Sequence, residues 1–421
     1  MTHGSTPAGG PARPSAGSRG LVVLVCGAVA LAVALGTRQT FGLFLVPISH
    51  DLGWSLSALA TGFALQQIFW GIGQPLAGAL ADTHGPRPVI AAGGMALAAG
   101  LLVMAYGGSV LAFQIGAGVL VGFALGAVGF SVVLGAVARA TPPDKRSSRL
   151  GIASAGGSFG MFAMVPIGQS LIDGLGWQGA LTALALVALS LLALALPLGG
   201  AGAKGTQAAA PVPAGPVSEG PGLRETVAAA LRHDGFWLLT AGFFVCGFHV
   251  AFIAVHLPGF VASCGLSAEV GTWALALVGL FNVGGSLLAG HLGGRYRPKG
   301  LLAGIYALRA LVILALLLSP KTPLVLLVFA AAMGVLWLST VPLTTGIVAG
   351  IFGPRYVSTL FGLVFLSHQV GAFLGALSGG LSVRWTGGYD AVWWISLALA
   401  LMAAIVHLPI RDARLPAYAA A

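Results

Sequence analysis

Long apolar runs constrain the fold of this chain more than any other feature of the sequence. A helix needs roughly 20 mostly apolar residues to cross about 30 Å of hydrocarbon. Twelve runs of about this length or longer are Leu21–Ile48, Leu56–Leu80, Val89–Tyr106, Val110–Ala138, Leu150–Ile172, Trp177–Leu198, Phe236–Val261, Val270–Leu292, Gly300–Leu318, Leu324–Ile351, Thr359–Val383 and Val392–Leu408. They lack the period-two alternation of barrel strands, so they predict an all-α membrane protein with twelve transmembrane helices.

The composition excludes the water-soluble classes of protein. Of the 421 residues, 57% are hydrophobic and only 7% are charged, whereas about 25% are charged in a typical soluble domain. So few charges cannot cover the surface of a soluble enzyme, and a disordered chain would be far less apolar. The three cysteines, Cys26, Cys246 and Cys264, lie in or beside apolar runs and imply no disulfide framework.

Positive charges gather at alternate ends of the runs. If the N-terminus is cytoplasmic, sixteen Lys and Arg residues fall in inner segments and two, Lys321 and Arg384, in outer segments. The positive-inside rule then predicts a multi-pass protein of the bacterial inner membrane with both termini in the cytoplasm. This distribution also accounts for the net charge of +10 without a nucleic-acid partner.

The chain divides into two halves of six runs each. We predict a cytoplasmic tail at 1–20, a bundle at 21–199, a flexible cytoplasmic linker rich in Pro, Gly and Ala at 200–234, a bundle at 235–410 and a cytoplasmic tail at 411–421.

An internal repeat relates the two halves. A shift of 211 residues aligns Gly36 with Gly247 and Arg38 with His249, and further pairs follow along the same runs. This repeat predicts two pseudo-symmetric six-helix bundles with a binding site between them near the middle of the membrane.

The segment after the second run reads GALADTHGPR from Gly78. It resembles the loop signature of the major facilitator superfamily, with matches at Asp82, Gly85 and Arg87. The resemblance implies that these three residues take part in gating. Asp82 at a helix end can hold a salt bridge and cap a neighbouring helix N-terminus. The alternative is an ordinary charged turn.

A narrower resemblance joins the chain to the monocarboxylate transporter and oxalate/formate antiporter branch of that superfamily. It is carried by the glycines of 151–160, by Arg38-Gln39-Thr40-Phe41-Gly42 and by His368-Gln369-Val370-Gly371. The chain departs from the animal members, since the acidic-Gly-aromatic motif before the first helix is absent. The eighth run also lacks the buried acidic and Arg residues of those members, and His368 stands where the oxalate exchanger has Lys.

Polar residues in the middle of the runs mark the candidate binding site, because buried polar groups are costly there. Every acidic residue lies at a helix end or in a loop, so Arg38 has no carboxylate to neutralise it. A bound anion would supply the missing negative charge and accept bidentate hydrogen bonds from the guanidinium. The alternative is that Arg38 snorkels outward or binds helix-end carbonyls.

Two histidines extend this candidate site. The repeat predicts that His249 faces Arg38 across the pseudo-twofold axis, where it could bind a carboxylate or carry a proton; a structural histidine is the alternative. His368 and its neighbour Gln369 are candidates for contact with the same cavity. Weaker candidates that also lie mid-run are Gln66, Asn282 and Trp337. Arg309 is interpreted as a structural partner of backbone carbonyls.

These features favour a secondary transporter of small organic anions, monocarboxylates above all, that works by alternating access. The alternative is an efflux transporter of amphiphilic drugs with the same fold; a membrane receptor is disfavoured because no sensor domain is present. No phosphate-binding loop, metal cluster or catalytic nucleophile is found, so we expect no enzyme, cofactor or metal. The expected partners are an anionic substrate, the lipid bilayer and a proton as candidate coupling ion, and the expected state is a monomer.

Overall fold

The computed structural model describes residues 16–199 and 221–418, and these residues are helical almost throughout. The elements are α1 (Ala16–Gln39), α2 (Phe41–Leu52), α3 (Leu56–His84), α4 (Pro86–Tyr106), α5 (Val110–Gln114), η1 (Ile115–Leu120), α6 (Val121–Val128), α7 (Phe130–Arg139), α8 (Pro143–Leu198), α9 (Leu223–Leu231), α10 (Asp234–Ser263), α11 (Ala268–Gly293), α12 (Pro298–Leu318), α13 (Pro323–Leu336), α14 (Thr340–Phe352), α15 (Val357–Thr386), α16 (Asp390–His407) and η3 (Pro416–Tyr418).

These elements form the twelve predicted spans. Ten helical segments of the described chain are long and apolar enough to cross a membrane. One of them, α8, holds two spans, because Gly176 has a φ of 69° and interrupts the helix between them. The 29-residue helix α3 lies where the second span is predicted and completes the set.

Three predicted spans are divided by local breaks that the apolar pattern does not show. The first divides at Thr40, whose hydroxyl donates to the Thr37 carbonyl at 2.8 Å. The fourth divides at Gly129, which has an extended backbone between α6 and α7. The tenth divides between α13 and α14, four residues before Pro342. Proline lacks an N–H and clashes with the carbonyl four residues earlier, so it disfavours a continuous helix there.

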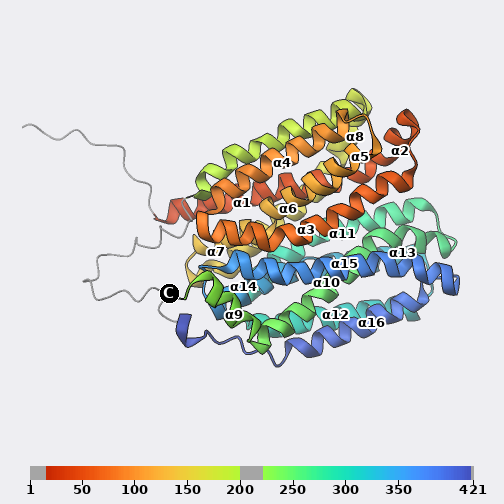
Figure 1. Ribbon diagram of the computed structural model, residues 1–421. Coiled ribbons are helices and arrows are strands. Elements are labelled where there is room, and N and C mark those ends of the chain that lie inside the picture. The colour runs from red at the N-terminus through yellow and green to blue at the C-terminus, as the bar shows by residue number, and fades with distance from the viewer. Residues whose placement is uncertain (1–15, 200–220, 419–421) are drawn as a thin grey trace, which may run out of the picture.

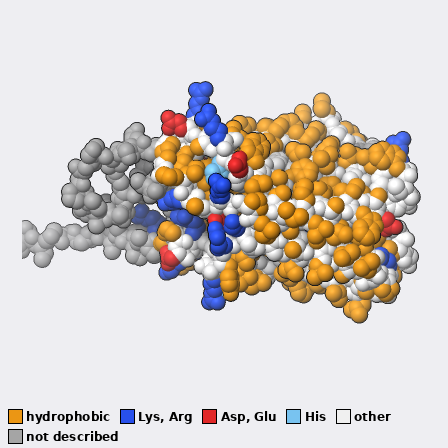
Figure 2. Space-filling model, turned by 90° about the horizontal axis from the view of Figure 1, so that it is seen from below, with side chains coloured by type: hydrophobic (Ala, Val, Ile, Leu, Met, Phe, Trp, Pro, Cys, Tyr) orange, Lys and Arg blue, Asp and Glu red, His pale blue; other side chains and the backbone are white. Residues whose placement is uncertain are grey.

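The spans pack as two bundles that meet along α3 and α15 (Figure 1). One bundle contains α1 to α8 and the other contains α10 to α16. The first and last described elements, α1 and η3, begin and end at the same end of the molecule. Figure 2 shows Lys and Arg side chains gathered at that end, next to a broad apolar surface. We call this end, which carries Arg139, Arg146 and Arg297, the basic end.

Glycines allow close approach both within and between the bundles. A Cβ on Gly160 of α8 would overlap the Ala32 backbone of α1. Between bundles, a Cβ on Gly151 of α8 would lie 2.6 Å from the Cα of Gly290 on α11. Small residues at such crossings let helix backbones pack directly in lipid.

The predicted tail at 1–20 and linker at 200–234 lie largely outside the described residues. The described part of the linker contains α9, a helix that its Pro-, Gly- and Ala-rich composition does not predict. Glu225 accepts from the backbone N–H of Gly222 at 3.0 Å and so supports the first turn of α9.

Candidate functional site

Arg38 lies at the last turn of α1, partly buried in the N-terminal bundle and without a carboxylate partner among the described residues. Its Nη2 donates to Gln67 Oε1 of α3 at 3.2 Å. The guanidinium carbon lies 5.0 Å from the centre of the Trp70 ring, a cation–π contact. Its Nε is buried and makes no hydrogen bond. The charge is therefore held by an amide and an indole, with hydrogen-bonding capacity left over.

The C-terminal bundle meets this arginine through α15. Gln369 Nε2 donates to the Gln67 carbonyl at 3.4 Å, across the boundary between the bundles. The amide oxygen of Gln369 lies 3.1 Å from Nδ1 of His368, so an Nδ1–H tautomer donates to it. We call Arg38, Gln67, Trp70, His368 and Gln369 the central polar cluster.

Aromatic rings pack beside the central polar cluster. The ring of Phe365 stacks on His368 with a centroid distance of 4.9 Å and lies 5.4 Å from the ring of Trp70. Phe243 of α10 packs against both rings, with centroid distances of 5.1 Å to His368 and 6.0 Å to Phe365. The two rings that contact His368 thus come from the C-terminal bundle, whereas Trp70 of the N-terminal bundle packs against Phe365, and together they give the cluster an apolar wall.

The expectation that His249 faces Arg38 is not met. His249 is 1% exposed, and its Nε2 lies 2.9 Å from the Ser396 carbonyl of α16 in its own bundle. The repeat correctly gives the position of His249 along α10, but the side chain points into the C-terminal bundle. A binding role for His249 therefore remains a prediction without support from this geometry.

The weaker candidates lie in three other places. Gln66 donates to the Ala117 carbonyl at 3.0 Å and so points into the N-terminal bundle. Asn282 donates to Ser158 Oγ at 2.9 Å and accepts from the Leu338 N–H at 3.1 Å, which ties α11 to α8 and to the α13–α14 break. Trp337 is buried at that break. None of the three contacts Arg38, and their roles in binding remain predictions.

Asp82 joins the two bundles at the basic end. It pairs with Arg139 of α7 at 2.5 Å. It also accepts from the backbone N–H and the hydroxyl of Thr359, at 2.7 and 2.8 Å, in the first turn of α15. A helix N-terminus favours a negative charge at this position. Arg139 additionally donates to Ser358 Oγ at 3.1 Å, so Asp82 and Arg139 together hold the start of α15.

The other two residues of the loop signature have separate places. Gly85 has a φ of 89°, in the region that favours glycine, and it separates α3 from α4. The side chain of Arg87 packs against Gly199 at the end of α8. The cation that pairs with Asp82 is thus Arg139 rather than a residue of the signature.

Gln67, Trp70 and Arg139 are site residues that the sequence pattern alone does not single out. Helical spacing could have found Gln67, because Gln67, Gly71, Gln74 and Asp82 follow one another at intervals of four, three and eight residues on α3. This face meets α15: a Cβ on Gly71 would lie 3.0 Å from the Gln369 side chain.

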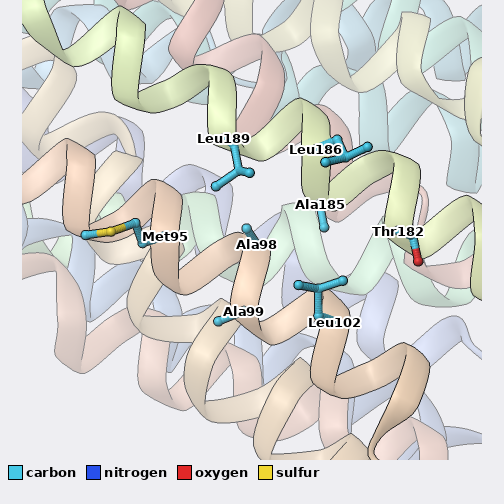
Figure 3. A pocket seen from close by; sticks show the side chains of 8 residues that line it. All are labelled: Met95, Ala98, Ala99, Leu102, Thr182, Ala185, Leu186 and Leu189. Atoms are coloured by element: carbon cyan, nitrogen blue, oxygen red, sulfur yellow. The ribbon is translucent and has the colours of Figure 1, made fainter.

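An apolar groove on the described surface lies away from the central polar cluster. It has a volume of about 290 Å³ and is formed by α4 and α8 (Figure 3). Its lining is apolar except for Thr182, and Met95, Leu102 and Leu186 are exposed there. It belongs to the outer, apolar face of the N-terminal bundle and offers nothing to bind a charged solute.

Comparison with known proteins identifies the family to which this chain belongs. The model of the family described as "Major Facilitator Superfamily" matches residues 27–376 and 262–419. The chain belongs to the major facilitator superfamily. Its members are transporters rather than enzymes, so the chain is a multi-pass secondary transporter of small molecules.

Relatives within the superfamily point to one branch. The chain is 26% identical to monocarboxylate transporter 13 of Rattus norvegicus over 92% of this chain and 88% of that protein. It is 26% identical to the uncharacterized MFS-type transporter YcxA of Bacillus subtilis (strain 168), over 88% and 90%. It is 24% identical to the oxalate:formate antiporter of Oxalobacter formigenes, over 84% and 82%. The chain thus resembles transporters of the monocarboxylate and oxalate:formate branch.

Solved structures agree on the fold. The chain superposes on the proton:xylose symporter XylE with a TM-score of 0.70 at 14% identity, covering 93% of this chain and 95% of that one. It superposes on the transporter FucP in the outward conformation with a TM-score of 0.67 at 16% identity, covering 92% and 97%. The predicted twelve-helix architecture of the superfamily is confirmed.

Proposed function

We propose that this protein moves small organic anions, monocarboxylates above all, across the bacterial inner membrane by alternating access. The observation that carries the proposal is Arg38, a partly buried residue with no carboxylate partner among the described residues and with a buried, unbonded Nε. The substrate carboxylate supplies the missing negative charge.

The chemistry of the guanidinium fits this substrate class. A charge at mid-membrane is costly, by a few to more than ten kcal/mol depending on the method, and such residues usually mark a transport pathway. A planar fork of N–H donors matches a carboxylate, and an apolar wall of Phe365 and Phe243 suits a short organic chain. The names of the relatives, which include monocarboxylate transporters and an oxalate:formate antiporter, support the same class.

A proton that travels with the substrate would bind at His368. This histidine belongs to the central polar cluster, whereas His249 points into the C-terminal bundle. Nε2 of His368 is buried and makes no hydrogen bond to the described residues, and we find no Asp or Glu in the cluster to compete for the proton.

The experiment that tests the proposal is uptake of labelled monocarboxylates into proteoliposomes by Arg38 variants. Loss of a desolvated charge pair costs ~2–5 kcal/mol, which corresponds to a 30- to several-thousand-fold loss of affinity. Arg38→Ala should therefore lose nearly all transport. Arg38→Lys keeps the charge but not the fork, so it should retain weak transport.

Arg384→Ala is the control, because that arginine is exposed at the end opposite the basic end. It should transport normally. Tight binding of a monocarboxylate by a folded Arg38→Ala protein, measured by calorimetry in detergent, would overturn the assignment and favour efflux of uncharged amphiphiles.

A further inference from the structure

A hollow at the basic end shares no residue with the central polar cluster. It has a volume of about 310 Å³ and lies where α9 meets α10 and where the chain leaves α16. Its lining residues are Arg232, His233, Asp234, Gly235, Leu238, Pro409 and Arg411. Figure 2, which views the molecule from the side of α9 and α16, shows Lys and Arg side chains gathered at the basic end beside the apolar surface.

Two arginines line this hollow without an ion-pair partner among the described residues. The ion pairs at this end join Arg139 to Asp82 and Arg297 to Asp412. Arg232 and Arg411 belong to neither pair, and both are exposed. Asp234 also lines the hollow, but it lies in the first turn of α10, where the helix N-terminus favours its charge. Two guanidinium groups against one carboxylate leave the hollow with a net positive charge.

His233 is held at the wall of the hollow by its neighbours. Its ring packs edge-on against Phe352 of α14, with a centroid distance of 5.6 Å. A Cβ on Gly235 would lie 2.8 Å from Cε1 of the ring, so glycine at this position leaves room for the imidazole. Nδ1 of His233 is buried and makes no hydrogen bond to the described residues. The imidazole is thus fixed in the lining beside the two arginines, with one nitrogen that no described residue satisfies.

The residues next to the hollow are apolar and exposed. Trp237 is 54% exposed, and its indole N–H donates to the Leu231 carbonyl at 2.8 Å, which fixes the ring against the end of α9. Leu231 and Leu408 are exposed as well. Tryptophan is enriched at the membrane–water interface, where its ring lies at the level of the lipid headgroups. A basic hollow with an apolar rim matches a phospholipid, whose phosphate is joined to acyl chains, better than a free phosphate.

We propose that this hollow binds the phosphate of an anionic phospholipid, with Arg232 and Arg411 donating to the phosphate oxygens and Trp237 lying against the apolar part of the lipid. Arginine suits this role because its planar group can donate two parallel hydrogen bonds to a phosphate. The two arginines come from opposite ends of the C-terminal bundle in sequence. A bound lipid would therefore join the α9–α10 corner to the segment that follows α16.

Native mass spectrometry of the protein in detergent tests the proposal, with phosphatidylglycerol as the anionic probe and phosphatidylcholine as the zwitterionic comparison. We expect the parent protein to bind phosphatidylglycerol more tightly. Each of Arg232→Gln and Arg411→Gln should raise the Kd for phosphatidylglycerol ~fivefold, the usual contribution of one basic residue near a lipid headgroup. Both side chains are exposed, so we expect the variants to fold as the parent does.

Arg224→Gln is the matched control. Arg224 is exposed on α9 at the same end of the molecule, but it does not line the hollow. The variant loses the same charge and should bind phosphatidylglycerol as the parent does. An equal loss of affinity in Arg224→Gln and Arg232→Gln would overturn the proposal, because binding would then follow net charge alone. Equal affinity of the parent protein for the two lipids would overturn it as well.

A second measurement distinguishes a lipid from a free phosphate. A ligand that binds only the folded protein raises its melting temperature. Phosphatidylglycerol should raise the melting temperature of the parent and Arg224→Gln proteins more than that of an Arg232→Gln/Arg411→Gln protein, whereas inorganic phosphate should act equally on all three. If inorganic phosphate instead stabilises the parent but not the double variant, and phosphatidylglycerol has no such effect, the lipid assignment is wrong. Neither measurement depends on the transported substrate.

Discussion

Two adjacent glutamines show how much a single step along a helix changes the surroundings of a residue. Gln66 is buried and donates to the Ala117 carbonyl within the N-terminal bundle. Gln67 accepts from Arg38, and its carbonyl accepts from Gln369 of the other bundle. Successive residues on a helix point about 100° apart, so one glutamine supports the fold and the other orients the proposed anion site.

Gln67→Leu should weaken transport at the level of substrate affinity. The variant removes the acceptor that holds the guanidinium in place, and hydrogen bonds to charged groups contribute ~1.5–3 kcal/mol, about 10- to 150-fold. We expect KM for a transported monocarboxylate to rise within this range. Gln66→Leu should instead lower the melting temperature in detergent while leaving KM nearly unchanged. Equal changes in KM for the two variants would contradict the distinction.

The candidate residues could be predicted from polarity alone, but the direction in which each side chain points from its helix could not. Arg38, His368 and Gln369 stand out because few polar residues interrupt these spans, and the structure brings all three into the central polar cluster. His249 is also a polar residue in the middle of an apolar span, yet its side chain points at the Ser396 carbonyl. A repeat fixes how far along a helix a residue lies, whereas its rotation depends on how the bundle packs.

At the scale of helices, the apolar pattern predicts the spans but not their breaks. Hydrocarbon acts on every residue of a span, so the signal accumulates over about 20 positions. A break depends on one or two residues. Pro342 gives a usable signal for the break between α13 and α14, whereas Gly129 is one of 65 glycines and does not stand out.

The first turn of α15 is the element-scale feature that Asp82 controls. Asp82→Asn keeps an oxygen for Thr359 but removes the negative charge that pairs with Arg139. Removing one member of a buried ion pair typically costs ~3–5 kcal/mol, and the retained hydrogen bonds reduce that cost. We expect the bundles to separate more often at the basic end, which can be read as faster maleimide labelling of Ser147→Cys in detergent.

Adjacent serines provide the control for this experiment. Ser147 lies against Gly293 of the other bundle, whereas Ser148 is exposed. Labelling of Ser148→Cys should proceed at the same rate with and without the Asp82→Asn substitution. An unchanged rate at Ser147→Cys would mean that Asp82 is part of an ordinary charged turn with no role in gating.

At the scale of the whole molecule, the described contacts between α3 and α15 extend from Gln67–Gln369 to Asp82–Thr359 at the basic end. Beyond Gln369 on α15, Phe373, Leu374 and Leu377 are exposed. The two bundles are thus closed against each other toward the basic end. Which side of the membrane is closed depends on the orientation of the basic end, and the charge asymmetry predicts that it faces the cytoplasm.

That orientation leads to a direct test by cysteine labelling in intact cells. Ser218 lies in the predicted linker, and Lys321 follows α12 at the predicted outer side. A membrane-impermeant maleimide should label Lys321→Cys in intact cells and Ser218→Cys only after the cells are opened, with the parent protein as background. Moving Lys and Arg out of the cytoplasm against the positive-inside bias is unfavourable, so the reverse pattern is not expected. Ready labelling of Ser218→Cys from outside would place the closed end, and with it the Asp82–Arg139 pair, on the opposite side of the membrane.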